Sequence, residues 1–214
     1  MSIAHTVLVV YLVTHSVLYG AGVPHTVDAF IRVRWVDDGD TVVLADGRRV
    51  RYSGINAPEV AHKDRPAQRF GAEARDFNLK LVYQKRVRLE FDWERHDQYG
   101  RVLAHVFLQD GTFVNAELVK RGYAHYVFRR PNTKYDSLLL RLQRKAMAER
   151  VGMWERFPDQ KGPFLGNRHS KRFHRVTCPF GKATSSKHRI IFKTQYDAFR
   201  VGFSPCKQCF NAAM

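Results

Sequence analysis

One stretch of sequence decides the fold: residues 30–59, FIRVRWVDDGDTVVLADGRRVRYSGINAPE. Apolar and charged residues alternate up to an acidic cluster at residues 37–40, and the apolar run 41–44 follows. This pattern predicts two strands around an acidic turn. Asp46-Gly47 is a typical hairpin turn, and the arm after it ends near Pro58, which cannot continue regular strand pairing. Three strands are therefore predicted before any helix.

The sequence that follows predicts the rest of one domain. Helical spacing of apolar residues predicts an amphipathic helix over 66–83, and the runs 86–91 and 102–108 read as strands. Asn115 can cap a short helix that ends at Arg121, and residues 137–151 form a longer helix. Five strands and three helices without regular alternation argue against a parallel sheet. They favour an α+β fold: a small antiparallel barrel of the oligonucleotide-binding (OB) type with helices packed on it.

Composition places the chain among ordinary globular proteins. The 214 residues include 36 Lys and Arg against 20 Asp and Glu, a net charge of +16, and 44% of them are hydrophobic. These values exclude collagen-like, mucin-like and wholly disordered chains. A charge this positive favours nucleic acid as the partner, with an anionic membrane as the alternative.

The C-terminal segment differs from the rest of the chain. Residues 157–167 hold two prolines and two glycines, which predicts a linker, placed at 157–163, between a domain at 29–156 and a small module at 164–210. Residues 161–214 carry eleven Lys and Arg and a single acid, Asp197. Ten of the sixteen net positive charges therefore lie in this segment.

The N-terminal residues form a strongly apolar stretch. Residues 3–23 are interrupted by histidines and glycines and are short for a membrane span. They resemble the core of a secretory signal, although no Lys or Arg precedes them. We expect a signal peptide or an N-terminal membrane anchor over residues 1–23, with a misassigned start or an extra strand as alternatives. Export would place the protein outside the cell or in its envelope, with transient membrane contact through this segment.

Several charged residues stand where strands end. Asp38 and Asp40 bring two carboxylates to one turn, where a hard cation can bind, although isolated acidic turns are commonly only solvated. Arg51, Glu59 and Arg101 would each, alone, be typical of a surface ion pair. Their order and spacing together are specific.

Four ordered motifs carry a family resemblance. They are V-x-D-G-D-T at 36–41, R-x-x-G-I-x-A-P-E at 51–59, D-x-Y-G-R-x-L-A at 97–104 and V-N-x-x-L-V-x-x-G-x-A at 114–124. With them the chain resembles the thermonuclease family, the staphylococcal-nuclease-like domains, over about residues 30–154. The resemblance implies a five-stranded OB barrel with three helices. It also implies calcium-dependent hydrolysis of phosphodiesters in DNA and RNA, with low sequence specificity and 3′-phosphate products.

The resemblance makes Arg51, Glu59 and Arg101 the catalytic residues. A phosphodiester under attack gathers charge on its oxygens, which guanidinium groups and a divalent cation can stabilise. Glu59 can orient or deprotonate the attacking water.

The resemblance also implies a calcium site. Its ligands would be Asp40, Asn56 and the backbone carbonyl of Ala57, with Asp38 supporting them. Asn56 stands where the family more often has aspartate, which removes one negative charge and should weaken calcium binding.

Aromatic and basic residues complete the expected nucleic-acid surface. Tyr99, Tyr126 and Phe128 are candidates for stacking on a base or bonding a phosphate, with core packing as the alternative for each. Basic side chains in loops are expected to contact phosphates without reading sequence: Lys63, Arg65, Arg129 and Arg130.

The three cysteines lie near the C-terminus, an odd number that fits a disulfide framework poorly. His174-x3-Cys178 and Cys206-x2-Cys209 form two half-sites separated by 27 residues, which predicts a closed tetrahedral zinc site. Disulfide or redox use of the thiols is the alternative, and His169 is an alternative to His174. The module is too small to bury much of a core, which favours a structural metal.

The module also carries a resemblance of its own. F-H-R-x-x-C-P at 173–179 and G-F-x-P-C-x-x-C at 202–209, with a helix-like stretch at 196–201, resemble the Ada-type metal-binding domain of bacterial alkylation-repair proteins. That family uses four cysteines, and His174 stands where its first cysteine would be. The resemblance implies metal-stabilised DNA binding, whereas the missing thiolate argues against methyl-phosphotriester repair.

The sequence thus predicts a calcium-dependent nuclease acting on DNA, RNA or both, with a basic zinc module that helps to hold the polyanion. One alternative is a non-catalytic nucleic-acid-binding protein built from a degenerate nuclease domain and the zinc module. Another is attachment of the basic surface to an anionic envelope.

Overall fold

The computed structural model describes residues 29–61 and 66–210. The segment expected to be a signal or anchor, residues 1–23, lies outside the described residues, as do Lys63 and Arg65. Among the described helices, none is long and apolar enough to cross a membrane.

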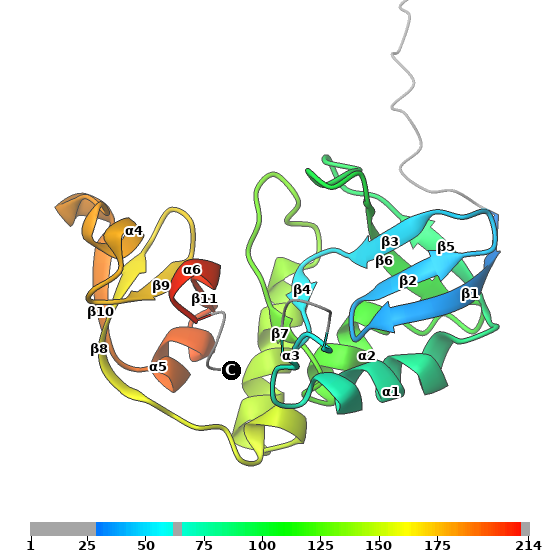
Figure 1. Cartoon of the computed structure of the whole chain (residues 1–214). Coiled ribbons are helices and arrows are strands. Elements are labelled where there is room, and N and C mark those ends of the chain that lie inside the picture. Colours follow the sequence, from blue (N-terminus) through cyan, green and yellow to red (C-terminus); the bar gives the residue numbers. More distant parts are fainter. Residues whose placement is uncertain (1–28, 62–65, 211–214) are drawn as a thin grey trace, which may run out of the picture.

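A closed five-stranded barrel forms the first half of the described chain and lies on the right in Figure 1. Its strands follow the order β1-β2-β3-β6-β5, with the bounds β1 Ile31–Asp38, β2 Thr41–Leu44, β3 Arg49–Tyr52, β5 Arg86–Glu90 and β6 Val102–Leu108. The predicted OB-type barrel is confirmed. One strand pair departs from the antiparallel expectation: β3 and β6 are parallel, because the chain crosses over between them.

The alternation that predicted the strands fills the barrel. In β5, Val87 and Leu89 are buried, whereas Arg86 is exposed. Most of the apolar core is made of β-branched and leucine side chains, which pack well on a pleated surface: Val33, Val36, Val42, Leu44, Val50, Leu89 and Val106.

The three predicted helices are present with different bounds; the first two pack on barrel strands and the third packs mainly on the second. They are α1 Gly71–Val82, α2 Val114–Lys120 and α3 Asp136–Ala148. The first begins later than Pro66 because Phe70, its N-cap, has a left-handed φ of 73° that a helix cannot contain.

The prediction that Asn115 caps the second helix is wrong. The N-cap is Phe113, and the Asn115 side chain is buried inside the first turn. Its Oδ1 accepts the Val106 amide at 3.0 Å and its Nδ2 donates to the Ser53 carbonyl at 2.9 Å. Asn115 therefore ties α2 to the barrel, because these two buried backbone groups need partners.

The C-terminal module is a four-stranded sheet with short helices, on the left in Figure 1. The strand order is β10-β8-β9-β11. The bounds are β8 Lys161–Asn167, β9 Arg172–Arg175, α4 Pro179–Lys182, η2 Ser186–His188, β10 Arg189–Thr194, α5 Gln195–Arg200, β11 Ser204–Pro205 and α6 Lys207–Phe210. The helix expected at 196–201 is α5.

The module is packed on the barrel domain rather than tethered to it. Met147 of α3 and Trp154 of η1 (Gly152–Trp154) share one buried cluster with Phe199 of α5 and other phenylalanines of the module. Phe157, in the stretch expected to be a linker, lies against Trp154 with ring centroids 5.0 Å apart, and β8 begins at Lys161 within that stretch. A shared apolar core fixes the two parts relative to each other.

Gln143 of α3 joins the two parts by hydrogen bonds. Its side chain is fully buried, its Oε1 accepts the Tyr126 amide at 2.7 Å, and its Nε2 donates to the Phe199 carbonyl at 2.6 Å. We expect Gln143→Ala to lower the free energy of unfolding by about 3 kcal/mol, because two buried backbone groups lose their partners. Urea unfolding measures this change. Arg141→Ala, at an exposed position of the same helix, is the control and should change it by less than about 0.5 kcal/mol.

Candidate active site and metal cluster

The acidic turn between β1 and β2 is held by close packing. Asp38 Oδ1 accepts the Asp40 amide at 2.8 Å. A Cβ at Gly39 would lie 2.5 Å from the Cβ of Ala57 and 2.8 Å from that of Ala74, so glycine alone lets the turn approach α1 and the loop that follows β4 (Ile55–Asn56). The turn thereby brings Asp40 against the loop that carries Ala57.

Arg51 of β3 connects this turn to the loop. Its Nη1 donates to the Tyr52 and Ile55 carbonyls at 2.9 and 3.0 Å. Its Nη2 donates to Asn56 Oδ1 at 2.9 Å and lies 3.0 Å from Asp40 Oδ2. With four oxygen partners, the guanidinium of Arg51 fixes the turn and the loop relative to each other. Its positive charge also lies where it can stabilise a bound phosphate.

The three oxygens predicted to bind calcium lie in one hydrogen-bonded cluster. The strand β4 (Ile55–Asn56) pairs with β7 (His125–Tyr126) and carries Asn56. Asn56 Nδ2 donates to the Ala57 carbonyl at 2.9 Å, and the Ala57 amide donates to Asp40 Oδ2. A carboxylate, an amide oxygen and a carbonyl are ligands that suit a hard cation.

The electrostatics of Asp40 also suit a cation. Burial raises the pKa of Asp40 to about 8, the Arg51 guanidinium opposes this rise, and the nearby Asp38 and Glu59 carboxylates add to it. A carboxylate that is this costly to ionise gains from a divalent cation placed against it. The residues therefore fit a calcium ion by donor type and by charge.

Arg101 is oriented by an acidic neighbour. Its Nη2 lies 2.7 Å from Asp97 Oδ2, to which its Nε also donates at 2.8 Å. Tyr99 lies under the guanidinium, whose carbon is 5.6 Å from the ring centroid, and it is 75% exposed. An exposed aromatic ring beside a fixed arginine is typical of a surface that binds nucleotides.

Two adjoining cavities, of about 370 and 280 Å³, open beside these residues; together we call them the cleft. Asn56 and Tyr99 line both, Glu59 lines the larger, and Arg51 and Arg101 line the smaller. The backbone amide of Glu59 donates to Gln68 Oε1 at 2.9 Å. The tertiary structure thus brings the three predicted catalytic residues to one place.

Two cationic residues of the C-terminal module, Arg172 and Lys207, line both cavities as well. Burial lowers the pKa of Arg172, and the guanidinium groups of Arg129 and Arg51 lower it further, whereas Cys206 opposes them. Like charges therefore meet across the cleft. Sequence reasoning found the excess charge of this segment but not these two residues, because only the docking of the module brings them to the cleft.

Tyr126 was a candidate for stacking on a base, and the structure corrects this: its side chain is 4% exposed and belongs to the barrel core. Phe128 is half-buried against the same core, under the guanidinium of Arg130. Neither residue lines the cleft. Core packing, the alternative for both residues, applies to Tyr126, because its side chain is one of the buried members of the barrel core cluster.

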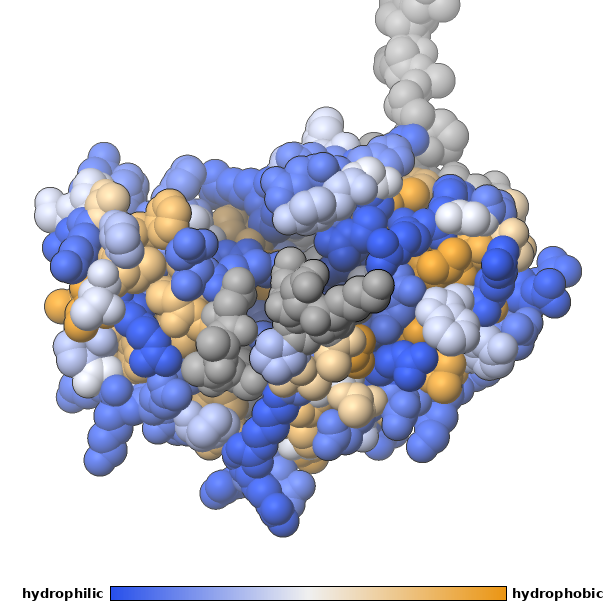
Figure 2. Space-filling view, viewed as in Figure 1, coloured by the Kyte–Doolittle hydropathy of each residue, from blue (hydrophilic) through white to orange (hydrophobic). Residues whose placement is uncertain are grey.

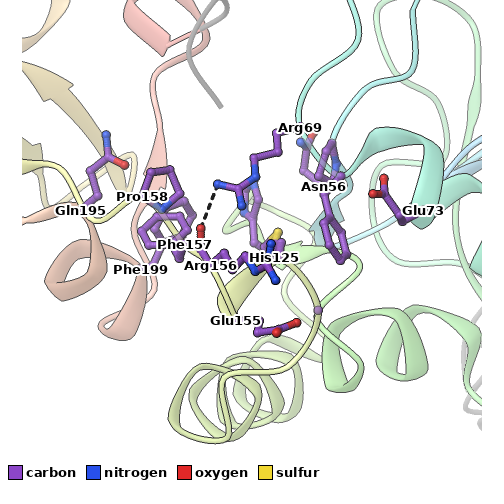
Figure 3. A pocket seen from close by; sticks show the side chains of 14 residues that line it. Asn56, Arg69, Glu73, His125, Glu155, Arg156, Phe157, Pro158, Gln195 and Phe199 are labelled. Carbon is purple, nitrogen blue, oxygen red and sulfur yellow. Dashed lines mark hydrogen bonds between the residues drawn. The ribbon is translucent and has the colours of Figure 1, made fainter.

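A third, mainly apolar cavity of about 270 Å³ lies between the two parts of the chain (Figure 3). Phe157 and Phe199 face it from one side and Asn56 and Arg69 from the other, and Arg69 donates to the Arg156 carbonyl at 2.9 Å. His125 lines this cavity and the larger one of the cleft. Burial lowers the pKa of His125 to about 4, so the imidazole is neutral at physiological pH.

The second candidate site is a cluster of thiols and an imidazole in the C-terminal module. The ligand atoms of His174, Cys178, Cys206 and Cys209 all lie within 4.8 Å of one another. His174 Nδ1 is 3.5 Å from Cys178 Sγ, whereas His169 is exposed and lies beside His188. These four donors match the ligand types of a closed tetrahedral zinc centre.

The charges of the thiols agree with a metal. Burial and the neighbouring thiols raise the pKa of Cys209 to about 12. At Cys178, burial raises the pKa, but backbone amides of Gly181 and Phe180 and the other thiols outweigh it and hold the pKa below its usual range. Three thiolates packed together would repel one another unless a cation lay between them. The donor set therefore fits a metal ion.

Comparisons with known proteins agree with this geometry. The family model of the staphylococcal nuclease homologues matches residues 49–156. The thermonuclease of Staphylococcus intermedius is 42% identical over 127 residues, 58% of this chain and 75% of that protein. The thermonuclease of Staphylococcus hyicus is 36% identical over 137 residues, 63% of this chain and 80% of that protein. The endonuclease YncB of Bacillus subtilis is 34% identical over 158 residues, 67% of this chain and 74% of that protein.

The matched residues include Arg51, Asn56, Glu59 and Arg101, and they end before the thiol cluster. Relatives that are nucleases favour catalysis over the non-catalytic alternative, and nucleic acid is the substrate that this class of enzyme hydrolyses. The motifs, the barrel and the comparisons together place the chain in the staphylococcal nuclease family, as a nuclease.

Proposed function

We propose that the chain is a calcium-dependent nuclease that cleaves DNA, RNA or both with little sequence selectivity and leaves 3′-phosphate ends. One observation carries the proposal. The oxygens of Asp40, Asn56 and Ala57 cluster at the edge of the cleft that Arg51, Glu59 and Arg101 line. Cation ligands, a carboxylate base and two guanidinium groups are what phosphodiester hydrolysis requires.

Each side chain then has a role. Glu59 takes a proton from water, the water oxygen bonds to phosphorus, and the bond to the 5′ oxygen breaks, with solvent supplying the proton that this oxygen takes up. Arg101 donates to the phosphate oxygens as their charge increases, while Arg51 adds a second positive charge beside them. Calcium, bound by Asp40, Asn56 and Ala57, would supply a further positive charge to the same oxygens.

Release of acid-soluble nucleotides from single-stranded DNA tests the proposal. The full chain is incubated with calcium, with magnesium and with chelator, and the ends of the products are labelled. We expect release with calcium only. The 3′ ends of the products should accept a labelled nucleotide only after phosphatase has removed the 3′ phosphate. Equal release in chelator would contradict the calcium requirement, and 5′-phosphate products would contradict the proposed bond cleavage.

Restoring a carboxylate at residue 56 should strengthen calcium activation. We expect Asn56→Asp to lower the calcium concentration for half-maximal activity by about tenfold, because it adds a charged ligand. It also removes the amide that now donates to the Ala57 carbonyl, which leaves that oxygen to the cation. A calcium titration of activity measures the change.

The control for this variant is Gln98→Glu, which adds the same charge to the same cleft at an exposed position. It should leave the calcium titration unchanged. An equal change in both variants would mean that general electrostatics, and not ligation by residue 56, sets the affinity.

We propose further that the C-terminal module holds a structural zinc ion on His174, Cys178, Cys206 and Cys209. The four donor atoms within 4.8 Å of one another support this, as does the likeness of the two half-sites to Ada-type metal-binding domains. The module then belongs with DNA-binding metal domains rather than with methyl-transfer proteins, because His174 replaces a thiolate. Metal analysis of the purified chain, with one zinc per molecule as the expected result, tests this.

We propose that residues 1–23 direct export or anchor the chain in the cell envelope. The enzyme would then act outside the cytoplasm, where calcium is plentiful and released nucleic acid is the substrate. The apolar composition of this segment supports the proposal. Nuclease activity should then be found in the envelope or the medium for the full chain, and inside the cell for a chain that begins at residue 24. An unchanged distribution would contradict it.

A further inference from the structure

We infer that the C-terminal module forms one wall of the substrate cleft, where Lys207 and Arg172 bind the phosphate backbone of the nucleic acid. The inference rests on the proposed function, since it assigns new residues to the binding of the same substrate. Both residues line the two cavities that also contain Asn56 and Tyr99. A strand lying in the cleft would therefore touch both parts of the chain.

Arg172 is held in place by the strand beside it. β9 pairs in parallel with β11, with Arg172 opposite Ser204. Arg172 Nη1 donates to Ser204 Oγ at 2.8 Å and to the Pro205 carbonyl at 3.3 Å. One arm of the guanidinium is thus anchored, and the group keeps further N–H donors for a phosphate, which it can bind through a fork.

Lys207 is positioned by the turn that carries the last two cysteines. It follows Cys206 directly, and the Cys206 amide donates to the Phe173 carbonyl at 2.9 Å. At the other end of the short helix α6, Phe210 is buried against Phe173. The backbone on either side of Lys207 is therefore fixed, while its side chain is exposed toward the cleft. A lysine of this kind acts as a point charge for phosphate.

The charge of the cleft needs an anion. The smaller cavity is lined by five cationic side chains, Arg51, Arg101, Arg129, Arg172 and Lys207, and by one acidic side chain, Asp97. Arg101 pairs with Asp97, Arg51 with Asp40 and Arg129 with Glu94. Among the described residues, this leaves Arg172 and Lys207 as the cations of this lining that have no ion pair. Cations gathered from two separate parts of the chain repel one another, and a polyanion lying between them removes that repulsion.

The arrangement of the sheet separates these two residues from Lys193, an exposed basic residue of the module. In the order β10-β8-β9-β11, Arg172 and Lys207 belong to the edge at β9 and β11, whereas Lys193 lies on β10 at the opposite edge. Hydrophilic side chains cover most of the face seen in Figure 2, so a hydrophilic surface by itself marks no site. The position at the cleft distinguishes Lys207 and Arg172 from the rest.

The experiment compares Lys207→Ala with Lys193→Ala, each in the full chain, on a single-stranded oligonucleotide. We expect Lys207→Ala to raise KM about three- to tenfold and to change kcat by less than about twofold, because the lost contact acts on bound substrate and transition state alike. Lys207→Arg keeps the charge and should keep KM near its original value. Lys193→Ala should change neither constant.

Binding without turnover gives a second readout. Affinity for the labelled oligonucleotide is measured without added calcium, in a Glu59→Gln background, over a range of salt concentrations. Loss of one phosphate contact by Lys207→Ala should lower the slope of log affinity against log salt by about 0.7. Arg172→Lys, which keeps the charge but loses the fork, should weaken binding with the slope nearly unchanged.

Two results would overturn the inference. One is an unchanged KM and salt slope in Lys207→Ala. The other is an equal loss in Lys193→Ala, which would mean that the whole module binds as an unspecific basic surface. Both are distinct from a failure of the proposed function, because the binding assay needs neither calcium nor cleavage and the unsubstituted chain is measured beside each variant.

Discussion

Replacing Arg101 by alanine is expected to lower kcat for single-stranded DNA by about 10²- to 10³-fold, the loss typical of one donor to a developing oxyanion. Its guanidinium lines the cleft and is held by Asp97 through Nε and Nη2. Nη1 remains for the phosphate. The donor acts on charge that increases in the transition state, so KM should change far less than kcat.

Steady-state kinetics on the purified variant check this expectation. Arg86→Ala, at an exposed position of β5, removes a charge of the same kind outside the residues that line the cleft and should change kcat by less than about twofold. An Arg101→Ala enzyme with the original turnover number would contradict the mechanism. The unfolding transition of both variants should stay close to that of the original chain, because Asp97 keeps the backbone amides of Tyr99 and Arg101 as hydrogen-bond donors when the Arg101 side chain is lost.

Arg51 differs from Arg101 in the effect that its loss is expected to have on folding. The sequence assigns both arginines the same catalytic role. In the structure Arg51 binds four oxygens, and its side chain is 14% exposed while that of its partner Asp40 is 5% exposed. Truncation would leave a buried carboxylate without its cation, which is strongly destabilising. Arg101 is therefore the residue at which catalysis can be tested apart from stability.

Loss of the His174 imidazole is expected to abolish high-affinity zinc binding and to unfold the C-terminal module. Binding energy of a structural metal is folding energy in a domain of this size, and His174 is one of four clustered donors. Trp154 reports the change, because its ring is 2% exposed and lies 5.2 Å from that of Phe199 in the module. Its fluorescence should move to longer wavelength, and strong chelators should cause the same change in the original chain.

His169→Ala is the matched control, since this histidine is exposed and lies outside the cluster. It should keep one zinc per chain and the original fluorescence. Trp35 and Trp93 are already 53% and 77% exposed and should contribute little to the shift. Full zinc content in His174→Ala together with loss in His169→Ala would assign the fourth ligand to the other histidine.

Local features carried most of what could be predicted about the fold. The barrel strands and the helices follow from apolar spacing and turn residues within short windows. The acidic turn and the loop at 56–59 could be identified because each motif is continuous in sequence. The helix starts and the role of Asn115 were missed because Phe70 and Phe113 are N-caps without a capping side chain, so no residue marks them.

The sequence by itself determined the barrel, the order of the motifs and the ligand types of both candidate metal sites. The tertiary structure decided which of these groups meet. It buried Tyr126, gave Arg51 four partners, and placed Arg172 and Lys207 at the cleft of a domain far away in sequence. The physical reason is that strands and turns depend on neighbouring residues, whereas docking depends on side chains such as Trp154, Gln143 and Phe199, whose shared burial no local pattern records.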